Sequence, residues 1–367
     1  MPDVDVAIVG AGVTGLAVAA ELAARGRSVC VLERHPRAGM ETSTHNSGVI
    51  HAGIYYPPGS LKARLCVEGR DRLYAFCAEH GVPHRRCGKL IVAADAGEVP
   101  ALEALEATAR ANGVDVSMVD AAFIRAREPY AAAIAALHSP DTGIVWAEGL
   151  VKALRRVCDR HDVAWLPGAP ITGADRAGAG LAVVTPRERI AAAIVVNAAG
   201  LYADEVSSMF GGEPFTIHPC RGEYAELAPK SRGIVKGLIY PVPHSPGHAL
   251  GVHLTPTTEG QVLVGPTAEY QQSKSDYEGG RMALDAFVAP TARLLPRITI
   301  DDLRPAGSGI RPKLNGPDEA FADFLIKVDS RVPNLVHAAG IDSPGLTSCL
   351  AVGRHTAEIV ESLIPHR

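Results

Sequence analysis

Residues 4–33 read VDVAIVGAGVTGLAVAAELAARGRSVCVLE, and their pattern predicts a strand, a tight turn, a helix and a second strand. The apolar run Val4–Val9 has the length of a short buried strand, and an alanine-rich helix is expected from Leu16 to Ala24. Gly26 follows that helix as a cap, and Ser28–Leu32 is expected to be the second strand.

Three glycines, Gly10, Gly12 and Gly15, form the pattern G-x-G-x-x-G at the end of the first strand. The first permits the turn, the second lets the backbone approach a pyrophosphate, and the third lets helix and strand pack closely. Glu33 ends the second strand, where it can accept hydrogen bonds from a ribose. The segment therefore predicts a dinucleotide site. It leaves NAD and FAD open and disfavours NADP, whose 2′-phosphate would meet the Glu33 carboxylate.

The composition sets wider limits on domain number and partners. The chain has 367 residues and a formal net charge of −4. This length predicts two domains, and the charge gives no sign of a nucleic-acid partner. The seven cysteines are scattered and include no C-x-x-C pair. We therefore expect reduced thiols, a cytoplasmic location and no metal site.

The apolar start of the chain has the hydropathy of a signal peptide, but the residues before it, MPDVD, are acidic rather than basic. No run of about 18 apolar residues occurs elsewhere, so no transmembrane helix is expected. Peripheral contact with the inner face of the membrane stays open.

Further along the chain, helices are expected at Leu61–Glu79 and Glu98–Asn112, with a strand at Lys89–Asp95 between them. From Arg221 to about Ser308, the segments EYAEL, LIYPVP, LGVHLTP and QVLVGPT alternate, as half-buried antiparallel strands do. The chain then returns to strand, glycine-containing turn and helix. We expect a discontinuous dinucleotide domain of residues 1–87, 145–220 and 325–367, and a substrate domain of residues 88–144 and 221–324.

With these features in place, the sequence resembles the D-amino-acid-oxidase-like FAD oxidoreductases. The likeness rests on the N-terminal motif, on NAAG (197–200) and on AGIDSPGLTSCLAVG (339–353). Within that family it is similar to the L-2-hydroxyglutarate dehydrogenases and oxidases in HNSGVIHAGIYYPPGSLKARLCVEG (45–69), PCRGEYAEL (219–227), LGVHLTPTTEGQVLVGP (250–266) and AGSGIRPKL (306–314). The likeness spans nearly the whole chain, but GIRPKLNGP (309–317) departs from the family's wording after the arginine.

The resemblance implies an α/β protein with a Rossmann-like FAD-binding domain, an inserted antiparallel-sheet substrate domain, and non-covalently bound FAD. It implies hydride transfer from a 2-hydroxy acid, most specifically L-2-hydroxyglutarate, to flavin N5, which yields 2-oxoglutarate. The electron acceptor would be oxygen or a quinone. The cofactor-binding residues that the resemblance implies are Gly10, Gly12, Val13, Thr14, Gly15, Glu33, Arg34, Thr44, Asn46, Ser47, Gly48, Ala199, Gly200, Gly309, Gly340, Pro344, Gly345, Leu346 and Thr347.

Oxidation of a hydroxy acid also needs a base for the hydroxyl proton, and histidine suits this task because its ordinary pKa is about 6.5. The candidates are His51 and His253. If Val252 and Leu254 face the core of the sheet, alternation along the strand turns His253 to the opposite face. The sequence leaves open which histidine is the base.

A carboxylate substrate also needs cations, and the candidates are Arg311, Arg221 and Lys313, because a guanidinium pairs well with a planar carboxylate. We count Arg311 with the two histidines as catalytic. Arg221 could instead be a structural contact at the domain junction, and Lys313 could be a surface lysine.

Residues 45–69 are expected to form a wall of the active site, with His51 facing the substrate. Tyr55 is expected to offer its hydroxyl to the substrate, and at most one of Tyr55 and Tyr56 should do so. Lys62 and Arg64 are expected to form a solvated helix face.

The rival functions are an FAD-dependent amino-acid or amine oxidase, a glycerol-3-phosphate oxidising enzyme, and a non-enzymatic flavin-bearing scaffold or assembly protein. An ammonium substrate would require an acceptor or a carboxylate in the pocket, whereas the candidate residues are histidines and arginines.

Overall fold

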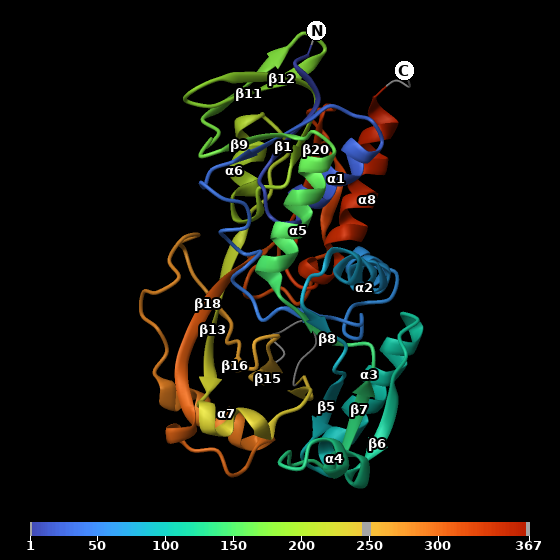
Figure 1. Cartoon of the computed structure of the whole chain (residues 1–367), viewed down its shortest axis with the longest axis vertical. Coiled ribbons are helices and arrows are strands. Elements are labelled where there is room, and N and C mark those ends of the chain that lie inside the picture. The colour runs from blue at the N-terminus through green and yellow to red at the C-terminus, as the bar shows by residue number, and fades with distance from the viewer. Residues whose placement is uncertain (1, 244–250, 365–367) are drawn as a thin grey trace.

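The fold was analysed in a computed structural model that describes residues 2–243 and 251–364; Leu250, the first residue of LGVHLTP, lies outside these ranges. The described chain is elongated and has two halves, each built on one large sheet (Figure 1). Both ends of the chain lie in the same half (Figure 1).

The half that holds the chain ends contains an eight-stranded sheet within the described residues. The strand order is β10-β11-β12-β1-β2-β9, with β20 beside β12 and β19 beside β20. Its strands are β1 (Val4–Val9), β2 (Val29–Glu33), β9 (Ala164–Pro167), β10 (Gly173–Ala177), β11 (Gly180–Val184), β12 (Arg189–Asn197), β19 (Leu325–Val328) and β20 (Leu335–Ala339). β1 runs parallel to β2 and to β12, so the predicted strand–helix–strand opening is confirmed.

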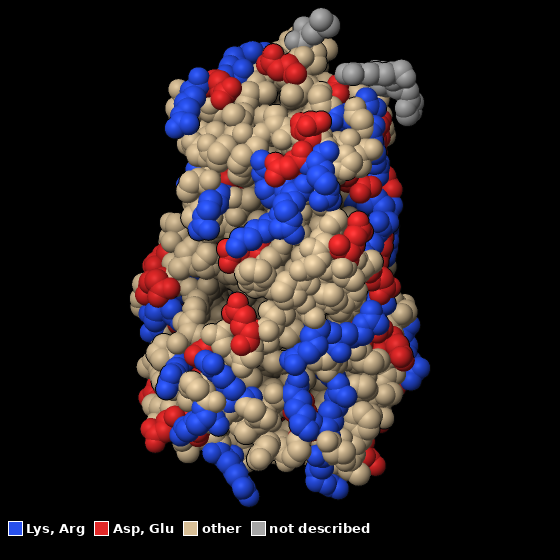
Figure 2. Space-filling view, viewed as in Figure 1, with Lys and Arg blue, Asp and Glu red and all other residues tan. Residues whose placement is uncertain are grey.

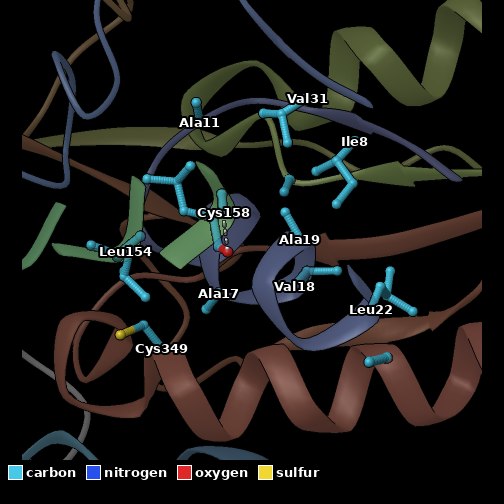
Figure 3. Packing of buried hydrophobic residues seen from close by; sticks show 14 of the residues in the cluster. Ile8, Ala11, Ala17, Val18, Ala19, Leu22, Val31, Leu154, Cys158 and Cys349 are labelled. Carbon is cyan, nitrogen blue, oxygen red and sulfur yellow. Dashed lines mark hydrogen bonds between the residues drawn. The ribbon is translucent and has the colours of Figure 1, made fainter. Parts of the chain in front are cut away.

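Both faces of the central parallel strands β1 and β2 are buried, which is usual for parallel strands. On β1, Val6 and Ile8 point into one apolar cluster, and Ala7 and Val9 point into another. The first cluster is covered by helices α1 (Val13–Ala24), α5 (Ala147–Arg160) and α8 (Gly345–Leu363). Figure 3 shows α1 lying between this sheet and α8.

The other half contains a nine-stranded sheet within the described residues, in the order β17-β13-β16-β15-β14-β5-β7-β6, with β18 beside β13. Its strands are β5 (Lys89–Ala93), β6 (Ser117–Asp120), β7 (Ala135–Ser139), β13 (His218–Leu227), β14 (Leu238–Pro241), β15 (His253–Pro256), β16 (Val262–Gly265), β17 (Glu269–Tyr270) and β18 (Leu303–Lys313). The predicted alternating strands are therefore present. The pairing is antiparallel except between β14 and β5, which join the two separate chain segments of this half.

At the junction of the two halves, β3 (Val49–Ile50), β8 (Gly143–Val145) and β4 (His84–Arg85) form a small sheet beside helix α2 (Leu61–His80). The predicted start of α2 is confirmed, because Ser60 accepts a hydrogen bond from the N–H of Ala63 at 3.1 Å. Gly81 ends the helix with a φ of 64°. The remaining α-helices of the described residues are α3 (Val99–Ala111), α4 (Ala121–Arg127), α6 (Ala203–Met209) and α7 (Val288–Leu294).

The mixed α/β fold predicted from the sequence is confirmed by the comparisons given below. All strands of the eight-stranded sheet fall within residues 1–87, 145–220 and 325–367, the ranges predicted for the dinucleotide domain. The strands of the nine-stranded sheet fall within the other ranges, except that β13 begins at His218. We therefore propose that the two halves are the dinucleotide domain and the substrate domain.

Candidate active site

A cavity of about 950 Å³ lies where the two halves meet. Its walls include the N-termini of α1 and α8, the loop before β3, and residues of β15 and β18. Figure 2 shows the surface hollowed near this level, with acidic and basic side chains interspersed around it. Ligand pockets reach about 1,000 Å³, so this cavity has room for an extended ligand.

The glycine-rich turn has the geometry that a dinucleotide requires. Gly10 has a φ of +103°, and a Cβ there would lie 2.5 Å from the carbonyl oxygen of Ala198. A Cβ on Gly12 would lie 2.8 Å from Ser43 Oγ. Gly12 offers no side-chain cap to α1, but Ser43 Oγ accepts a hydrogen bond from the N–H of Val13 at 3.0 Å. Gly12, Val13 and Thr14 line the cavity, so the positive end of the helix faces the space where phosphates would lie.

Glu33, the last residue of β2, holds the chain around this turn, and Arg34 follows it. Buried Glu33 accepts hydrogen bonds from the backbone N–H groups of Ala11 and His35, both at 2.9 Å. The guanidinium of Arg34 lies 4.2 Å from the ring centroid of Tyr202. Each Glu33 oxygen keeps a free lone pair, so a ribose contact remains compatible with this structural role.

The loop before β3 is held by its own side chains. Asn46 donates to the carbonyl oxygens of Thr42 and Ser43 and accepts from the N–H of Gly48 at 2.8 Å. The loop also touches the other half of the protein, since a Cβ on Gly309 would collide with the carbonyl oxygen of His45. This close backbone approach joins the two halves at the cavity wall.

Helix α8 begins at the same cavity. Its N-cap, Pro344, makes no side-chain cap, and Gly345 and Leu346 line the cavity. Thr347 is fully buried; its Oγ1 accepts a hydrogen bond from the N–H of His51 at 2.9 Å and donates to the carbonyl oxygen of Val49 at 3.2 Å. The N-termini of α1 and α8 therefore face one cavity, which fits a ligand with a pyrophosphate and a second group that gains negative charge.

The two candidate histidines are brought to this cavity. His51 Nε2 lies 3.3 Å from Ser343 Oγ, which in turn lies 3.3 Å from the hydroxyl of Tyr56. His51 Nδ1 is buried and has no hydrogen-bond partner. A buried nitrogen without a partner beside a ligand-sized cavity indicates that the partner belongs to the ligand.

His253 is placed by the alternation predicted from the sequence. Val252 and Leu254 pack in the apolar cluster on the far face of the sheet, and His253 lines the cavity. Its Nδ1 lies 2.9 Å from the carbonyl oxygen of Gly251, so we assign the proton to Nδ1 and the free lone pair to Nε2. Burial, with a smaller contribution from the nearby Lys89 amine, lowers the pKa of both His51 and His253 to about 3, so both imidazoles are neutral at pH 7.

Arg311 lines the cavity with weak contacts. Its guanidinium nitrogens lie 3.4 Å from the carbonyl oxygen of Thr267 and 3.9 Å from Cys220 Sγ. Among the described residues, no carboxylate lies within 4.0 Å of this guanidinium. A cavity-facing arginine without an acidic partner is a binding group for an anion.

Arg221 does not line the cavity. It is buried, and its guanidinium pairs with Glu223 at 2.9 Å and donates to the carbonyl oxygen of Gly279 at 2.5 Å. Arg221 was predicted as a substrate ligand, but its charge is already neutralised by a buried acid. The structural role at the domain junction is the one that fits.

Lys62 corrects a second expectation. Instead of standing on a solvated helix face, Lys62 is 5% exposed, lines the cavity, and pairs with Asp342 at 2.7 Å. Lys313 also lines the cavity and lies 3.4 Å from the same carboxylate, so it is not a free surface lysine. The two lysines and Asp342 form a charged wall that the sequence did not indicate.

Most of the predicted residues meet at the cavity. The predicted residues that line it are Gly12, Val13, Thr14, Asn46, Ser47, Gly48, His51, Tyr55, Gly200, His253, Gly309, Arg311, Lys313, Pro344, Gly345 and Leu346. The predicted residues that do not line it are Gly10, Gly15, Glu33, Arg34, Thr44, Ala199, Arg221, Gly340 and Thr347. Tyr55 and Tyr56 both line the cavity, although the sequence suggested that at most one would contact a substrate.

A separate cluster of Glu213, Asp329 and His337 offers three ligand atoms within 4.8 Å of one another. These atoms already have partners, because His337 Nε2 bonds Asp329 at 2.8 Å and Lys327 pairs with Glu213 at 2.8 Å. The cluster is therefore explained as a structural network. Among the described residues, no helix combines the length and hydropathy needed to cross a bilayer.

The comparisons with known proteins agree with this geometry. A family model described as DAO, FAD dependent oxidoreductase, matches residues 5–359. The chain is 35% identical to the mitochondrial L-2-hydroxyglutarate dehydrogenase of Nematostella vectensis, over 96% of this chain and 90% of that protein. It is 30% identical to the L-2-hydroxyglutarate dehydrogenase of Escherichia coli (strain K12), over 98% of this chain and 94% of that protein.

Solved structures are also similar. L-alpha-glycerophosphate oxidase from Mycoplasma pneumoniae, with FAD bound, has a TM-score of 0.88 and 27% identity, over 98% of this chain and 94% of that chain. Glycine oxidase from Geobacillus kaustophilus has a TM-score of 0.84 and 22% identity, over 99% of this chain and 95% of that chain, and shares the fold. With two helix N-termini and a glycine-rich turn facing one cavity, the chain belongs to the DAO family of FAD-dependent oxidoreductases, and its cofactor is FAD.

Proposed function

We propose that the protein oxidises L-2-hydroxyglutarate to 2-oxoglutarate. The observation that carries this proposal is Arg311, a cavity-facing guanidinium without an acidic partner in the described residues, in the same cavity as two neutral histidines. A carboxylate beside a hydroxyl is the group that such a site would hold and deprotonate. The relatives described above are L-2-hydroxyglutarate dehydrogenases, which supports this substrate.

Arg311 holds the carboxylate next to the reacting carbon by a bidentate contact, which fixes the orientation of the C–H bond. The weak contacts of its guanidinium at 3.4 Å leave its N–H groups available for this ligand. Tyr55 and Lys313 complete the contacts to the substrate from the same cavity.

His51 is the base in this proposal. With its Nε2–H directed to Ser343 Oγ, the lone pair of Nδ1 accepts the hydroxyl proton of the substrate as its C–O bond becomes a carbonyl. His253 offers its Nε2 lone pair to the same substrate and keeps it in place. FAD, when bound, supplies the acceptor for the hydride that leaves the carbon.

A second candidate is oxidation of glycerol 3-phosphate. Arg311 and Lys313 lie two residues apart on β18, and a phosphate accepts hydrogen bonds from both side-chain types. The similar solved structure from Mycoplasma pneumoniae is an L-alpha-glycerophosphate oxidase. Testing both substrates on the same preparation separates the two candidates.

The electron acceptor and the location are part of the proposal. We propose oxygen or a quinone as the acceptor, and a cytoplasmic protein whose membrane contact, where present, is peripheral and on the inner face. Admitting air to the reduced protein, or adding a soluble quinone without air, distinguishes the acceptors. Sedimentation with lipid vesicles tests the contact.

The deciding experiment is anaerobic addition of L-2-hydroxyglutarate while the flavin absorbance near ~450 nm is followed. Rapid bleaching supports the proposal, whereas an unchanged spectrum contradicts it. L-lactate, glycerol 3-phosphate and glycine are added to parallel samples. Bleaching by one of these alone would assign the site to that substrate.

A further inference from the structure

Lys89 is the most buried cation near the site. It is the first residue of β5, and its side chain is 1% exposed. It shares one face of the strand with Ile91 and Ala93, which are fully buried in an apolar cluster. An amine therefore stands at the edge of an apolar layer, next to the cavity wall.

The amine has no polar partner in the protein. Among the described residues, Lys89 Nζ makes no hydrogen bond and lies within 4.0 Å of no carboxylate. It lies instead 4.6 Å from the ring centroids of both Tyr55 and Tyr240. Two cation–π contacts offset only part of the loss of water around a buried ammonium. Burial accordingly lowers the pKa of Lys89 to about 7.

The titratable groups on the neighbouring elements do not change charge near this pH. From α2, burial raises the pKa of the Cys66 thiol to about 12. Burial also raises the pKa of Tyr55, in the loop after β3, and of Tyr240, on β14, above the ordinary value. His51 and His253 are already neutral, as described above.

The charged groups that lie further from Lys89 are paired with other residues or belong to the opposite face of the sheet. Arg70 of α2 bonds Asp71 at 2.8 Å and lies 3.3 Å from Asp141. On β7, His138 pairs in register with Leu90, so it belongs to the opposite face of β5 from Lys89. Arg127 of α4 donates to the carbonyl oxygen of Cys87. Between pH 7 and 9, Lys89 is therefore the group in this surrounding that changes charge.

Lys89 is separated from the cavity by a single aromatic layer. Tyr240 has the amine on one face and the imidazole of His253 stacked on it with a centroid distance of 3.7 Å. Tyr55, Tyr240 and His253 all line the cavity. A negative charge placed there acts on the amine through protein rather than water, where the interaction is poorly screened.

We propose that Lys89 helps to hold a dicarboxylate substrate in the cavity by supplying a positive charge. Its amine takes up a proton when the dicarboxylate enters the cavity, and the resulting ammonium stabilises the bound dianion. This inference rests on the proposed function, because it assumes a substrate with two carboxylates. In this inference, Lys89 supplies a buried positive charge opposite the substrate, and this charge is present only while the substrate is bound. The free enzyme thereby avoids an uncompensated cation in its core.

The test is isothermal titration calorimetry of the oxidised, FAD-loaded enzyme with 2-oxoglutarate at pH 8.5, in two buffers of different ionisation enthalpy. The difference between the heats gives the number of protons taken up. We expect an uptake approaching one proton per ligand, with the affinity falling up to tenfold per pH unit above about pH 7. Working at this pH leaves the neutral histidines out of the titration.

Lys89→Met keeps the length of the side chain and removes the amine, and we expect it to abolish the uptake and the pH dependence. Lys89→Gln is the second variant, should the methionine protein fold poorly. Lys313→Met is the matched control: it removes a cavity lysine that is paired with Asp342, so it should weaken binding and retain the uptake.

Equal proton uptake in wild type and Lys89→Met would overturn the inference, and so would pH-independent binding in the wild type. Failure of the proposed function looks different, because L-2-hydroxyglutarate would then leave the flavin oxidised. A flavin that L-2-hydroxyglutarate bleaches, together with binding that takes up no proton, refutes the role of Lys89 alone.

Discussion

The imidazole of His253 lies flat against the ring of Tyr240, with a centroid distance of 3.7 Å and 18° between the planes. Tyr240 is itself 1% exposed and packs in the apolar cluster beneath the cavity. The orientation of the His253 imidazole therefore depends on Tyr240, whose ring is fixed by packing. It also depends on the hydrogen bond between Nδ1 and the carbonyl oxygen of Gly251.

Removing the Tyr240 ring should free the imidazole. We expect Tyr240→Ala to lower the unfolding free energy by about 3–5 kcal/mol, as for other large core truncations. The flavin reduction rate should fall by roughly 10²-fold, because a small misplacement of a positioned group has effects of that size. Stopped-flow reduction and thermal unfolding measure the two effects. Tyr240→Phe keeps the ring and should stay near wild type; an equal loss in that variant would show that the hydroxyl, and not the stack, matters.

The proposed base can be tested directly. We expect His51→Ala to lower the anaerobic reduction rate by about 10²–10⁴-fold, the usual contribution of a general base, with FAD still bound. Ser343→Ala removes the group next to His51 Nε2 and should have a smaller effect. His253→Ala in the same assay compares the two histidines. Unchanged reduction kinetics in His51→Ala would remove His51 from the mechanism.

Arg311 and Arg221 form a matched pair for the carboxylate contact. We expect Arg311→Met to raise KM by about 10²-fold, since a charge-assisted hydrogen bond contributes about 1.5–3 kcal/mol. Arg221→Met should leave KM near wild type and lower the unfolding free energy by about 3 kcal/mol, because it breaks a buried ion pair with Glu223. Arg281, 2.9 Å from the same carboxylate, keeps that loss at the lower end of the range. Steady-state kinetics and denaturant unfolding separate the two roles. A normal KM in Arg311→Met would show that Arg311 does not bind the substrate carboxylate.

The lowered pKa of Lys89 also predicts how the unfolding free energy of the ligand-free protein depends on pH. Its pKa is about 7 in the folded protein against 10.5 as the ordinary value. Between these pH values the unfolded chain holds a proton that the folded chain has released, so rising pH favours the folded state by about 1.4 kcal/mol per pH unit. Lys89→Met should therefore be more stable than wild type at pH 7, and this advantage should shrink between pH 7 and 10. Denaturant unfolding across this range measures it, and a constant difference would contradict the lowered pKa.

Local patterns made the fold and part of the site predictable. The glycines between Val9 and Leu16 force one backbone path, and the apolar neighbours of His253 fix the side of the sheet on which it lies. Both patterns act over a few residues, so they can be read without knowing the rest of the chain.

The errors have a different origin, because they depend on side-chain contacts that are defined only in the folded chain. Lys62 follows the pattern of a helix surface, and only the folded chain brings Asp342 to it. Arg221 stands in a strand beside the predicted pocket, but Glu223 on the same strand and the Gly279 carbonyl use its charge. Lys89 did leave a signal: it is the only cation in the apolar strand Lys89–Ala93, and a buried cation is rare enough to mark a site.

The hydrogen bond from the His51 backbone to Thr347 ties the proposed base to the helix at whose start the cofactor is expected. Arg311, Tyr240 and His253 belong instead to the other sheet. Of the proposed substrate contacts, Arg311, Lys313 and His253 thus lie in one module, whereas the proposed base and Tyr55 lie with the expected cofactor site in the other. New substrates could evolve by changes in one module alone, while the alignment between base and cofactor is inherited unchanged from the other.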